Sequence, residues 1–323
     1  TVNDWVNSGA TITAGTLDWE GLVLTNSGQI QGSGIGLDAQ QLHHTGVMLS
    51  SDGIDMTQSG NVSLEGWVLA SNNVSMRVLG NVSNQAVISA NDVLVSANAL
   101  ENAGFIMARN GVMVTANSVM NEQLVSANQH IVMAAQTVSN NGVIMSLNTM
   151  ALSASDHVTN AGLVASGAHM AIETLQFTND GTRGDDLNDF SSGIQAWGGL
   201  SLNAITLSNR DGLILAQDMT VNALSVDNTD GQVVDVGDHT EFNVETFNNV
   251  GGRLESNGVT QLMGDLDNQS GLVFSGQGLS AGVVLNQNGQ LLANGGVISI
   301  DMPGEFNNTN GSVINYGGDV QVS

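Results

Sequence analysis

The sequence predicts an all-β fold: a right-handed parallel β-helix, or solenoid, of roughly 16 coils with about 19 to 20 residues each. Two observations predict this fold. An asparagine returns about every 18 to 22 residues, which is the length of one solenoid coil. An apolar residue stands two places before each asparagine, and a glycine follows most of them by two or three places. The asparagines of this series are Asn102, Asn121, Asn140, Asn160, Asn179, Asn209, Asn228, Asn249, Asn268, Asn286 and Asn308.

Apolar residues at fixed distances after the asparagine mark the expected inward rows. The tenth, twelfth and fourteenth positions alternate with polar or variable residues, which is the period of a β-strand. Val114, Met133 and Leu152 hold the twelfth position in three neighbouring repeats. Each coil should therefore contain two or three short strands that pair in parallel with the next coil. A leucine-rich horseshoe would need a Leu-x-x-Leu-x-Leu signature, which these repeats lack.

The asparagine and the glycine have separate roles at the expected corner of each coil. Asparagine bonds neighbouring backbone groups in tight turns, tolerates left-handed φ and ψ, and forms amide ladders when it is stacked. Glycine is expected to supply positive φ where a Cβ would clash. His44 and Leu64 occupy degenerate copies of the corner, and the pair His43-His44 is expected to form an exposed variant turn.

The spacing from asparagine to glycine divides the chain into three segments. Residues 1–179 use Asn-x-Gly, and residues 193–323 use Asn-x-x-Gly. Residues 180–192 form an insertion, which is expected to leave the stack as a loop. With paired strands ~4.8 Å apart, the coils would make one continuous monomeric rod roughly 75 Å long. The first residues already resemble the middle of a repeat, so we expect the chain to be a piece of a longer protein.

Composition and charge argue against several functions. The formal net charge is −25 at pH 7, and lysine is absent, so all 5 basic residues are arginines. Phosphate backbones and anionic lipid headgroups both attract clustered cations, so neither a nucleic-acid partner nor lipid insertion is expected. Cysteine is also absent, which suits a secreted protein whose stability comes from a stacked core rather than from disulfides. No apolar run approaches the ~18 residues of a spanning helix.

Stretches 102–116 and 160–167 begin with Asn-Ala-Gly and continue into the inward apolar rows. They resemble the haemagglutinin-type repeats of large bacterial exoproteins exported by two-partner secretion, and the likeness covers essentially the whole chain. That family includes filamentous haemagglutinin-like adhesins and effectors of contact-dependent growth inhibition. The resemblance implies a filament secreted to the outer surface of a Gram-negative cell. It also implies two partners, an outer-membrane transporter during export and a receptor on a host cell or a neighbouring bacterium.

The insertion carries two motifs that point to binding. Arg183, Gly184 and Asp185 form a possible recognition loop, because this tripeptide is the kind that integrins bind. Three residues are easily matched by chance, and loops are rich in glycine and aspartate. The carboxylates of the insertion are also candidate oxygen ligands for Ca²⁺, with a solvated acidic loop as the alternative. These carboxylates belong to Asp180, Asp185, Asp186 and Asp189.

A catalytic role is not expected, and neither a metal nor a cofactor is assigned. Some β-helices are polysaccharide lyases or hydrolases, but lyases usually need a basic residue, and the arginines here are scattered. Hydrolases need acids that converge on one face. Asp227, Asp230, Asp235 and Asp238 are close in sequence but lie in turn-like contexts. The histidines lack metal-ligand spacing, and the methionines are expected mostly on inward rows.

The sequence therefore favours a structural or adhesive shaft segment of a secreted bacterial surface filament, which mediates attachment or presents a distal domain. The first alternative is the stalk or receptor-binding region of a contact-dependent growth inhibition protein that delivers a toxin. The second is a polysaccharide-degrading β-helix enzyme, which would need a groove with converging acids.

Overall fold

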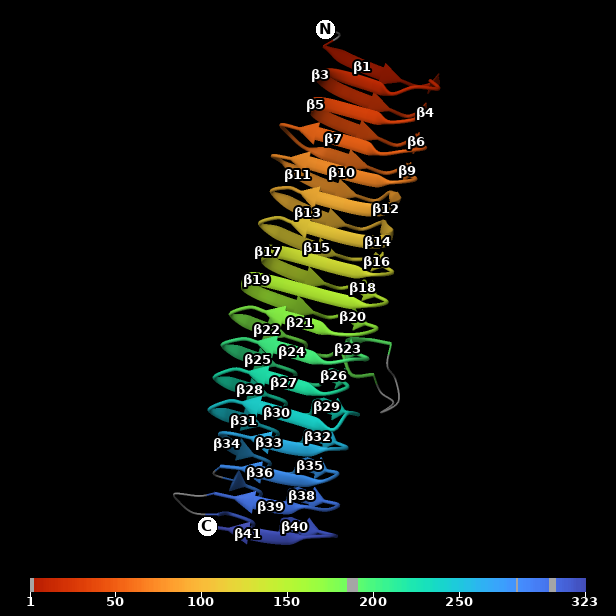
Figure 1. Cartoon of the computed structure of the whole chain (residues 1–323). Coiled ribbons are helices and arrows are strands. Elements are labelled where there is room, and N and C mark those ends of the chain that lie inside the picture. Colours follow the sequence, from red (N-terminus) through yellow and green to blue (C-terminus); the bar gives the residue numbers. More distant parts are fainter. Residues whose placement is uncertain (1–2, 185–190, 283, 302–305) are drawn as a thin grey trace. The chain divides into compact units, whose positions relative to one another are not determined.

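The computed structural model describes residues 3–184, 191–282, 284–301 and 306–323, and every regular element in these residues is a β-strand. The chain divides into two compact units, Thr1–Ala154 (unit 1) and Ser155–Ser323 (unit 2). The boundary lies inside strand β19 (Thr149–Asn160). Strands of successive coils pair in parallel throughout each unit, so the predicted parallel β-solenoid is confirmed (Figure 1).

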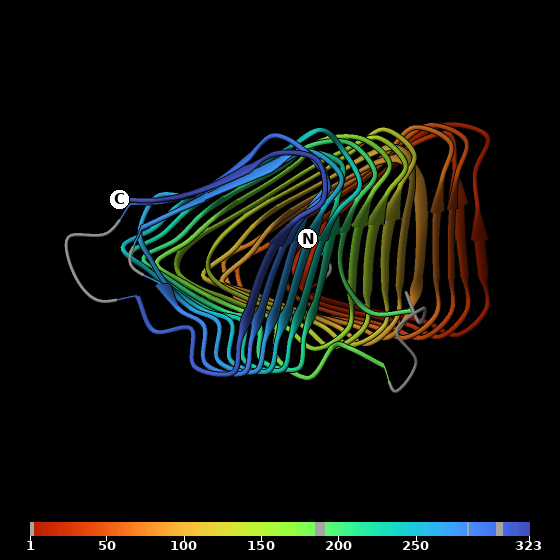
Figure 2. The same ribbon diagram turned by 90° about the horizontal axis from the view of Figure 1, so that it is seen from below.

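Each coil of unit 1 has three strand-bearing faces, which we name A, B and C in chain order after the asparagine corner (Figure 2). Face A contains β2 (Ala10–Ile12), β4 (Gln29–Gly32), β6 (Val47–Ser50), β9 (Trp67–Ala70), β16 (Leu124–Ala127), β18 (Val143–Ser146) and the first halves of β12 (Val87–Ser96) and β14 (Phe105–Thr115). Face B contains the second halves of β12 and β14, together with β7 (Ile54–Gln58), β10 (Asn73–Val78) and the first halves of β3 (Leu17–Asn26), β5 (Ile35–His44) and β17 (His130–Asn140). Face C contains the remaining halves of β3, β5 and β17, with β1 (Asp4–Asn7), β8 (Val62–Leu64), β11 (Asn81–Asn84), β13 (Ala99–Asn102) and β15 (Ser118–Asn121).

Unit 2 repeats the same three faces with shorter strands. Face A contains β20 (Leu163–Ser166), β23 (Gly193–Ala196), β26 (Leu213–Ala216), β29 (Gln232–Asp235), β32 (Arg253–Ser256), β35 (Leu272–Ser275), β38 (Gln290–Ala293) and β40 (Ser312–Asn315). Face B contains β21 (Met170–Glu173), β24 (Leu200–Asn203), β27 (Met219–Asn222), β30 (His239–Asn243), β33 (Val259–Leu262), β36 (Gly278–Ala281), β39 (Val297–Ile300) and β41 (Asp319–Val322). Face C contains the end of β19, β22 (Gln176–Thr178), β25 (Thr206–Ser208), β28 (Ser225–Asp227), β31 (Thr246–Asn248), β34 (Asp265–Asp267) and β37 (Val284–Leu285).

The inward rows form the core, as the period of two predicts. Val114 pairs with Met133 in register, and both side chains are fully buried. Leu152, at the same position of its repeat, is only 1% exposed. The apolar residue two places before each asparagine is buried as well, apart from Phe306, which is half-buried. Successive coils therefore merge their apolar rows into a dry column, which a single coil cannot form alone.

The asparagine positions stack into a buried column in each unit, and their amides form the expected ladder. In unit 2 each amide nitrogen donates to the amide oxygen of the next asparagine at 2.7 to 2.8 Å. The ladder bond from Asn179 to Asn209 crosses the insertion at 2.8 Å, so the insertion does not disturb the stack. The unit 2 column is Asn160, Asn179, Asn209, Asn228, Asn249, Asn268, Asn286 and Asn308.

The unit 1 column contains two residues that are not asparagine. It runs Asn7, Asn26, His44, Leu64, Asn84, Asn102, Asn121 and Asn140. The repeat pattern in the sequence does not mark Asn84, because Ala86 stands where a glycine follows most of the other copies. The apolar side chain of Leu64 cannot hydrogen-bond, so it interrupts the ladder between His44 and Asn84.

His44 belongs to this buried column, so the predicted exposed turn at His43-His44 is wrong for His44. His44 is fully buried, whereas His43 is exposed. The Asn26 amide oxygen accepts from Asn7, so its nitrogen donates to Nδ1 of His44 at 2.8 Å. Nε2 of His44 then donates to the Trp67 carbonyl at 3.0 Å. The neutral imidazole therefore accepts from the asparagine before it and donates to a backbone carbonyl, as Asn102 also does in its part of the column.

The expected use of left-handed backbone is also corrected. No asparagine of the column has positive φ in the described residues. In the Asn-x-x-Gly corners the left-handed residue lies two places after the asparagine, as at Asp211 and Asp230, with φ of 51° and 54°. The following glycine closes the turn, as when Gly231 N–H donates to the Asn228 carbonyl at 3.0 Å. A Cβ on Gly231 would overlap the Asn209 carbonyl oxygen, so close packing between coils, not positive φ, requires glycine there.

We expect Asn228→Ala to lower the free energy of unfolding by about 1–3 kcal/mol, because buried amide partners above and below lose a hydrogen bond. Asn209 donates to Asn228 at 2.7 Å, and Asn228 donates to Asn249 at 2.8 Å. Asn222→Ala is the matched control, since Asn222 belongs to a solvent-exposed amide ladder with Asn203. Urea denaturation should show a clear loss for the first variant and a change within about 0.5 kcal/mol for the second. Equal losses would contradict a special contribution of the buried ladder.

The stability of the wild-type protein should depend on pH through His44. Burial lowers the pKa of His44 below its ordinary 6.5, against the raising effect of the bond to the Trp67 carbonyl. The unfolded chain takes up this proton near pH 6.5, so the contribution is complete above that pH and is lost as pH falls through the folded-state pKa. Each unit of pKa difference is worth about 1.4 kcal/mol.

His44→Asn is the matched variant for this effect, because it restores the residue type of the column and removes the titration. Denaturation midpoints of both proteins should be compared between about pH 8 and pH 5, a window that brackets the ordinary histidine pKa. The wild type should lose more stability across this window than the variant. Parallel pH profiles would show that His44 does not resist protonation in the folded protein.

Candidate interaction surface

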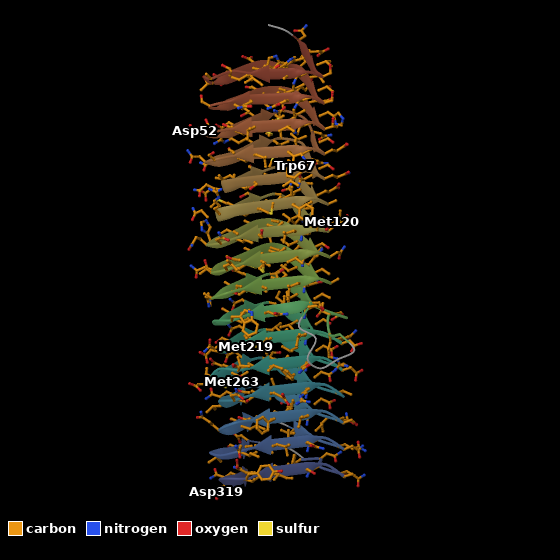
Figure 3. All side chains as sticks on the ribbon, turned by 90° about the vertical axis from the view of Figure 1, so that its right-hand side faces the viewer. Asp52, Trp67, Met120, Met219, Met263 and Asp319 are labelled. Atoms are coloured by element: carbon orange, nitrogen blue, oxygen red, sulfur yellow. The ribbon has the colours of Figure 1, made fainter. Side chains whose placement is uncertain are left out.

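Face A of unit 1 presents an uncharged, mostly apolar surface to solvent. We name its outward residues on β6, β9, β12, β14, β16 and β18 the apolar strip: Val47, Leu49, Trp67, Leu69, Val87, Phe105, Met107, Leu124, Val143 and Met145, with Ser89 and Ser126 among them. Trp67 is 52% exposed and Phe105 is 42% exposed. Figure 3 looks onto the side that carries the face A strands and labels Trp67.

Parallel register creates the strip from residues that are far apart in sequence. Val47 pairs with Trp67, Trp67 with Val87, and Val87 with Phe105. The same column continues through Leu124 to Val143. Side chains of one outward column therefore stand about 4.8 Å apart on successive coils. A contiguous exposed apolar patch on a protein of net charge −25 marks an interaction surface more strongly than scattered apolar residues would.

Charged residues lie only along the borders of the apolar strip. Exposed Glu65 and Glu122 follow the asparagine column, at the corner that leads into face A. Asp52, Asp92 and Arg109 lie at the opposite corner, where face A leads into face B. The Asp92 carboxylate accepts hydrogen bonds from the Asn110 amide at 2.7 Å and the Gly111 N–H at 3.0 Å. The border is therefore acidic on both sides, with one arginine.

The equivalent face of unit 2 is closed near the insertion. Leu213 and Leu215 point to the same side of β26 yet are only 1% and 5% exposed. The Leu213 N–H donates to the Thr182 hydroxyl at 3.0 Å. The Gln195 amide on β23 donates to the Ser192 carbonyl at 3.2 Å. The two described ends of the insertion therefore lie against face A of unit 2.

The predicted recognition loop is only partly described. Arg183 is held against the next coil, because its guanidinium lies 3.2 Å from the Asp211 carboxylate and its N–H donates to the Asp211 carbonyl at 2.8 Å. Gly184 is the last described residue before the gap. Asp185 lies outside the described residues. The guanidinium that the integrin hypothesis requires is therefore already paired with a carboxylate of this chain.

The calcium candidates Asp185, Asp186 and Asp189 also lie outside the described residues. Asp180 is described and acts as a turn cap, accepting from the Ser208 hydroxyl at 2.7 Å and the Arg210 N–H at 2.9 Å. In the described ranges, no three histidine, aspartate or glutamate side chains are placed to hold a metal ion.

The acids Asp227 and Asp235 lie at opposite ends of face A rather than together at one corner. Asp227, next to the asparagine corner, accepts from the Thr229 hydroxyl at 2.6 Å and from Arg210 at 2.5 Å. Its pKa is lowered, because burial, which would raise it, is outweighed by these bonds. Asp235 lies after face A and accepts from Gly237 N–H at 2.7 Å and the Thr240 hydroxyl at 2.5 Å. Burial raises the pKa of Asp235 despite these bonds.

Two shallow depressions in unit 1 collect polar groups. On face B, the acids Asp18, Glu20, Asp38 and Asp55 and the backbone of Gly36 line a shallow hollow of about 430 Å³. On face C, a polar groove of about 420 Å³ runs across several coils. Its polar lining residues are Gln41, His43, Asn61, Ser63, Asn81, Ser83 and Glu101.

Among the described residues the buried methionines outnumber those at the surface, as expected, although several lie on outward positions. The buried methionines are Met48, Met56, Met76, Met133, Met150, Met170 and Met219. Met113 and Met263 are 45% and 67% exposed, and Met107 and Met145 belong to the apolar strip. The sequence alone does not reveal the strip, because runs such as Phe105–Ala108 are apolar on both sides of the strand. Such a run does not show which of its side chains face solvent.

Comparison with known proteins adds no relative to this picture. The described ranges contain no helix that is long and apolar enough to cross a bilayer. No protein-family model, no curated protein and no solved structure matches the chain. What is established is a parallel β-solenoid with one bare apolar face and one face closed by an insertion.

Proposed function

We propose that the chain is a structural and adhesive shaft segment of a secreted bacterial surface filament, exported by two-partner secretion. One observation carries the proposal: the inner rows and the buried asparagine column recur along both units, with His44 and Leu64 as the two replacements in unit 1, while the outward columns vary. A repeated interior extends along one axis, so adding coils adds length and surface rather than a single reaction centre. The resemblance to haemagglutinin-type repeats supports the same role.

The charged residues of unit 2 support a role without catalysis. Asp180, Asp227 and Asp235 each accept hydrogen bonds that close turns. Hydrolysis needs a carboxylic acid and a carboxylate that face one substrate bond. Asp180 and Asp227 lie at the asparagine corner, whereas Asp235 lies at the other end of face A, and each carboxylate caps its own turn. These acids therefore do not face one substrate bond as a pair. We therefore propose that the function lies in display and contact.

The partners follow from this role. We propose an outer-membrane transporter of the two-partner type during export, and a receptor on a host cell or neighbouring bacterium afterwards. A receptor-binding region of a contact-dependent growth inhibition protein is the second candidate. The apolar strip favours it, because a purely mechanical spacer has no use for an exposed patch of this kind. Binding of the purified chain to host cells supports the first candidate, and binding to outer membranes of related bacteria supports the second.

A single cysteine should report where the chain resides in the producing cell, because the wild-type sequence has none. Leu147 is 61% exposed, and its neighbour Ser146 is 1% exposed. Leu147→Cys should react with a membrane-impermeant maleimide on intact cells, and Ser146→Cys only after denaturation. Deleting the gene for the transporter should abolish labelling of intact cells. Labelling of Leu147→Cys only after cell lysis would refute the proposed location.

A further inference from the structure

We propose that the apolar strip of unit 1 docks a partner protein whose apolar ridge is bordered by lysine and arginine side chains. The proposal goes beyond the shaft role, because it names a surface and the chemistry of what binds there. It rests on the composition of the strip, on the charge of its borders, and on what covers the equivalent face in unit 2.

The composition of the strip favours contact with another apolar surface. Its outward positions carry aliphatic, aromatic, methionine and serine side chains and no charge. Trp67 and Phe105 are the large aromatic residues, and residues of this type dominate binding energy at protein interfaces. Their Cα partner Val87 lies between them, so the two rings flank one coil on the same column.

The size of the strip, together with the charge around it, argues against a second copy of this chain as the occupant. Six four-residue strands cover roughly 29 by 13 Å, or about 400 Å², at ~4.8 Å per strand and ~3.3 Å per residue. A stable interface needs about 800 Å² from each partner, so the strip can only be the centre of a larger contact with a polar rim. In a self-complex the rims would bring like charges together, which opposes association.

The charge of the borders selects the partner. Glu65 and Glu122 lie on one edge, and Asp52 and Asp92 lie on the other, where Arg109 is the single cation. The acids of face B, including Asp38 and Asp55, lie beyond that second edge. Complementary rims steer association and suppress wrong partners. Lysine and arginine on the partner match these borders, whereas anionic lipid headgroups are repelled by them.

Unit 2 shows that the same face accepts a covering segment of polypeptide. There the ends of the insertion bond to β23 and β26 through Gln195 and the Leu213 N–H, and the outward Leu215 is 5% exposed. The strip of unit 1 has no such segment among the described residues. A partner protein would therefore supply in trans the kind of cover that unit 2 receives from its own chain.

The test uses the full chain and a fluorescent synthetic peptide of alternating leucine and lysine as the probe. Fluorescence anisotropy should show binding that weakens roughly tenfold or more in the double variant Trp67→Ser, Phe105→Ser, since buried aromatic residues dominate such contacts. Leu79→Ser is the matched control, because Leu79 is 80% exposed but lies outside the strip, and it should bind as the wild type does. Circular dichroism checks that each variant keeps its β-structure. Equal binding by wild type and double variant would overturn the proposal.

A second measurement keeps the test independent of folding in the double variant. The leucine–lysine peptide should shift the tryptophan emission of the wild type to shorter wavelength, and Trp67→Phe should remove that shift while keeping an aromatic ring in the strip. A peptide of alternating serine and lysine separates charge from apolar contact, and it should bind wild type and double variant alike and more weakly. Stronger binding to phosphatidylcholine vesicles than to the leucine–lysine peptide, or a stable dimer in sedimentation, would also overturn the proposal.

Discussion

The stacking of successive coils in register is the constraint on which the rest of the structure depends, and the buried asparagine column enforces it. An asparagine side chain carries one donor group and one acceptor group on a short stem, so a stacked amide can accept from one neighbour and donate to the next. Asn228 does both at 2.7 and 2.8 Å. A slip of one residue would bury a different side chain and turn every strand face over. Because an unpaired buried amide is costly, the column admits only one register.

Register also turns repeated outward residues into surfaces. The core needs the same small set of apolar side chains in every coil, so the interior leaves little freedom for functional variation. The outward columns carry no such restriction. Face A of unit 1 is apolar, the first coils of face B are acidic, and face C carries amides and hydroxyls. A solenoid therefore separates stability, which the inside supplies, from contact, which each outward column can change independently.

The insertion shows how such a stack tolerates extra chain. It leaves just after Asn179, at a corner, and the strand that follows pairs with the coil before it, with Leu163 opposite Gly193 and Val164 opposite Ile194. The Asn179–Asn209 bond keeps its normal length across the extra residues. Thr182 supplies a hydroxyl to the Leu213 N–H, so the start of the insertion is built into the coil rather than appended to it. Each strand of a solenoid pairs with the coils above and below it, whereas the residues of a corner do not. Extra residues therefore leave the stack at corners.

The sequence alone determined the repeat length, the inward rows, the asparagine corner and the site of the insertion, since each of these is a spacing along one chain. Val114, Met133 and Leu152 are buried as their alternation predicts. The properties that arise between coils were decided only by the tertiary structure. Asn84 and His44 belong to the ladder because of what lies above and below them, although no glycine follows Asn84 and His44 is a different residue. The corner glycines are needed because a neighbouring carbonyl lies close, and left-handed φ falls on Asp211 and its equivalents. The apolar strip likewise exists only after stacking, because Val47, Trp67 and Phe105 become neighbours through parallel pairing and not through the chain.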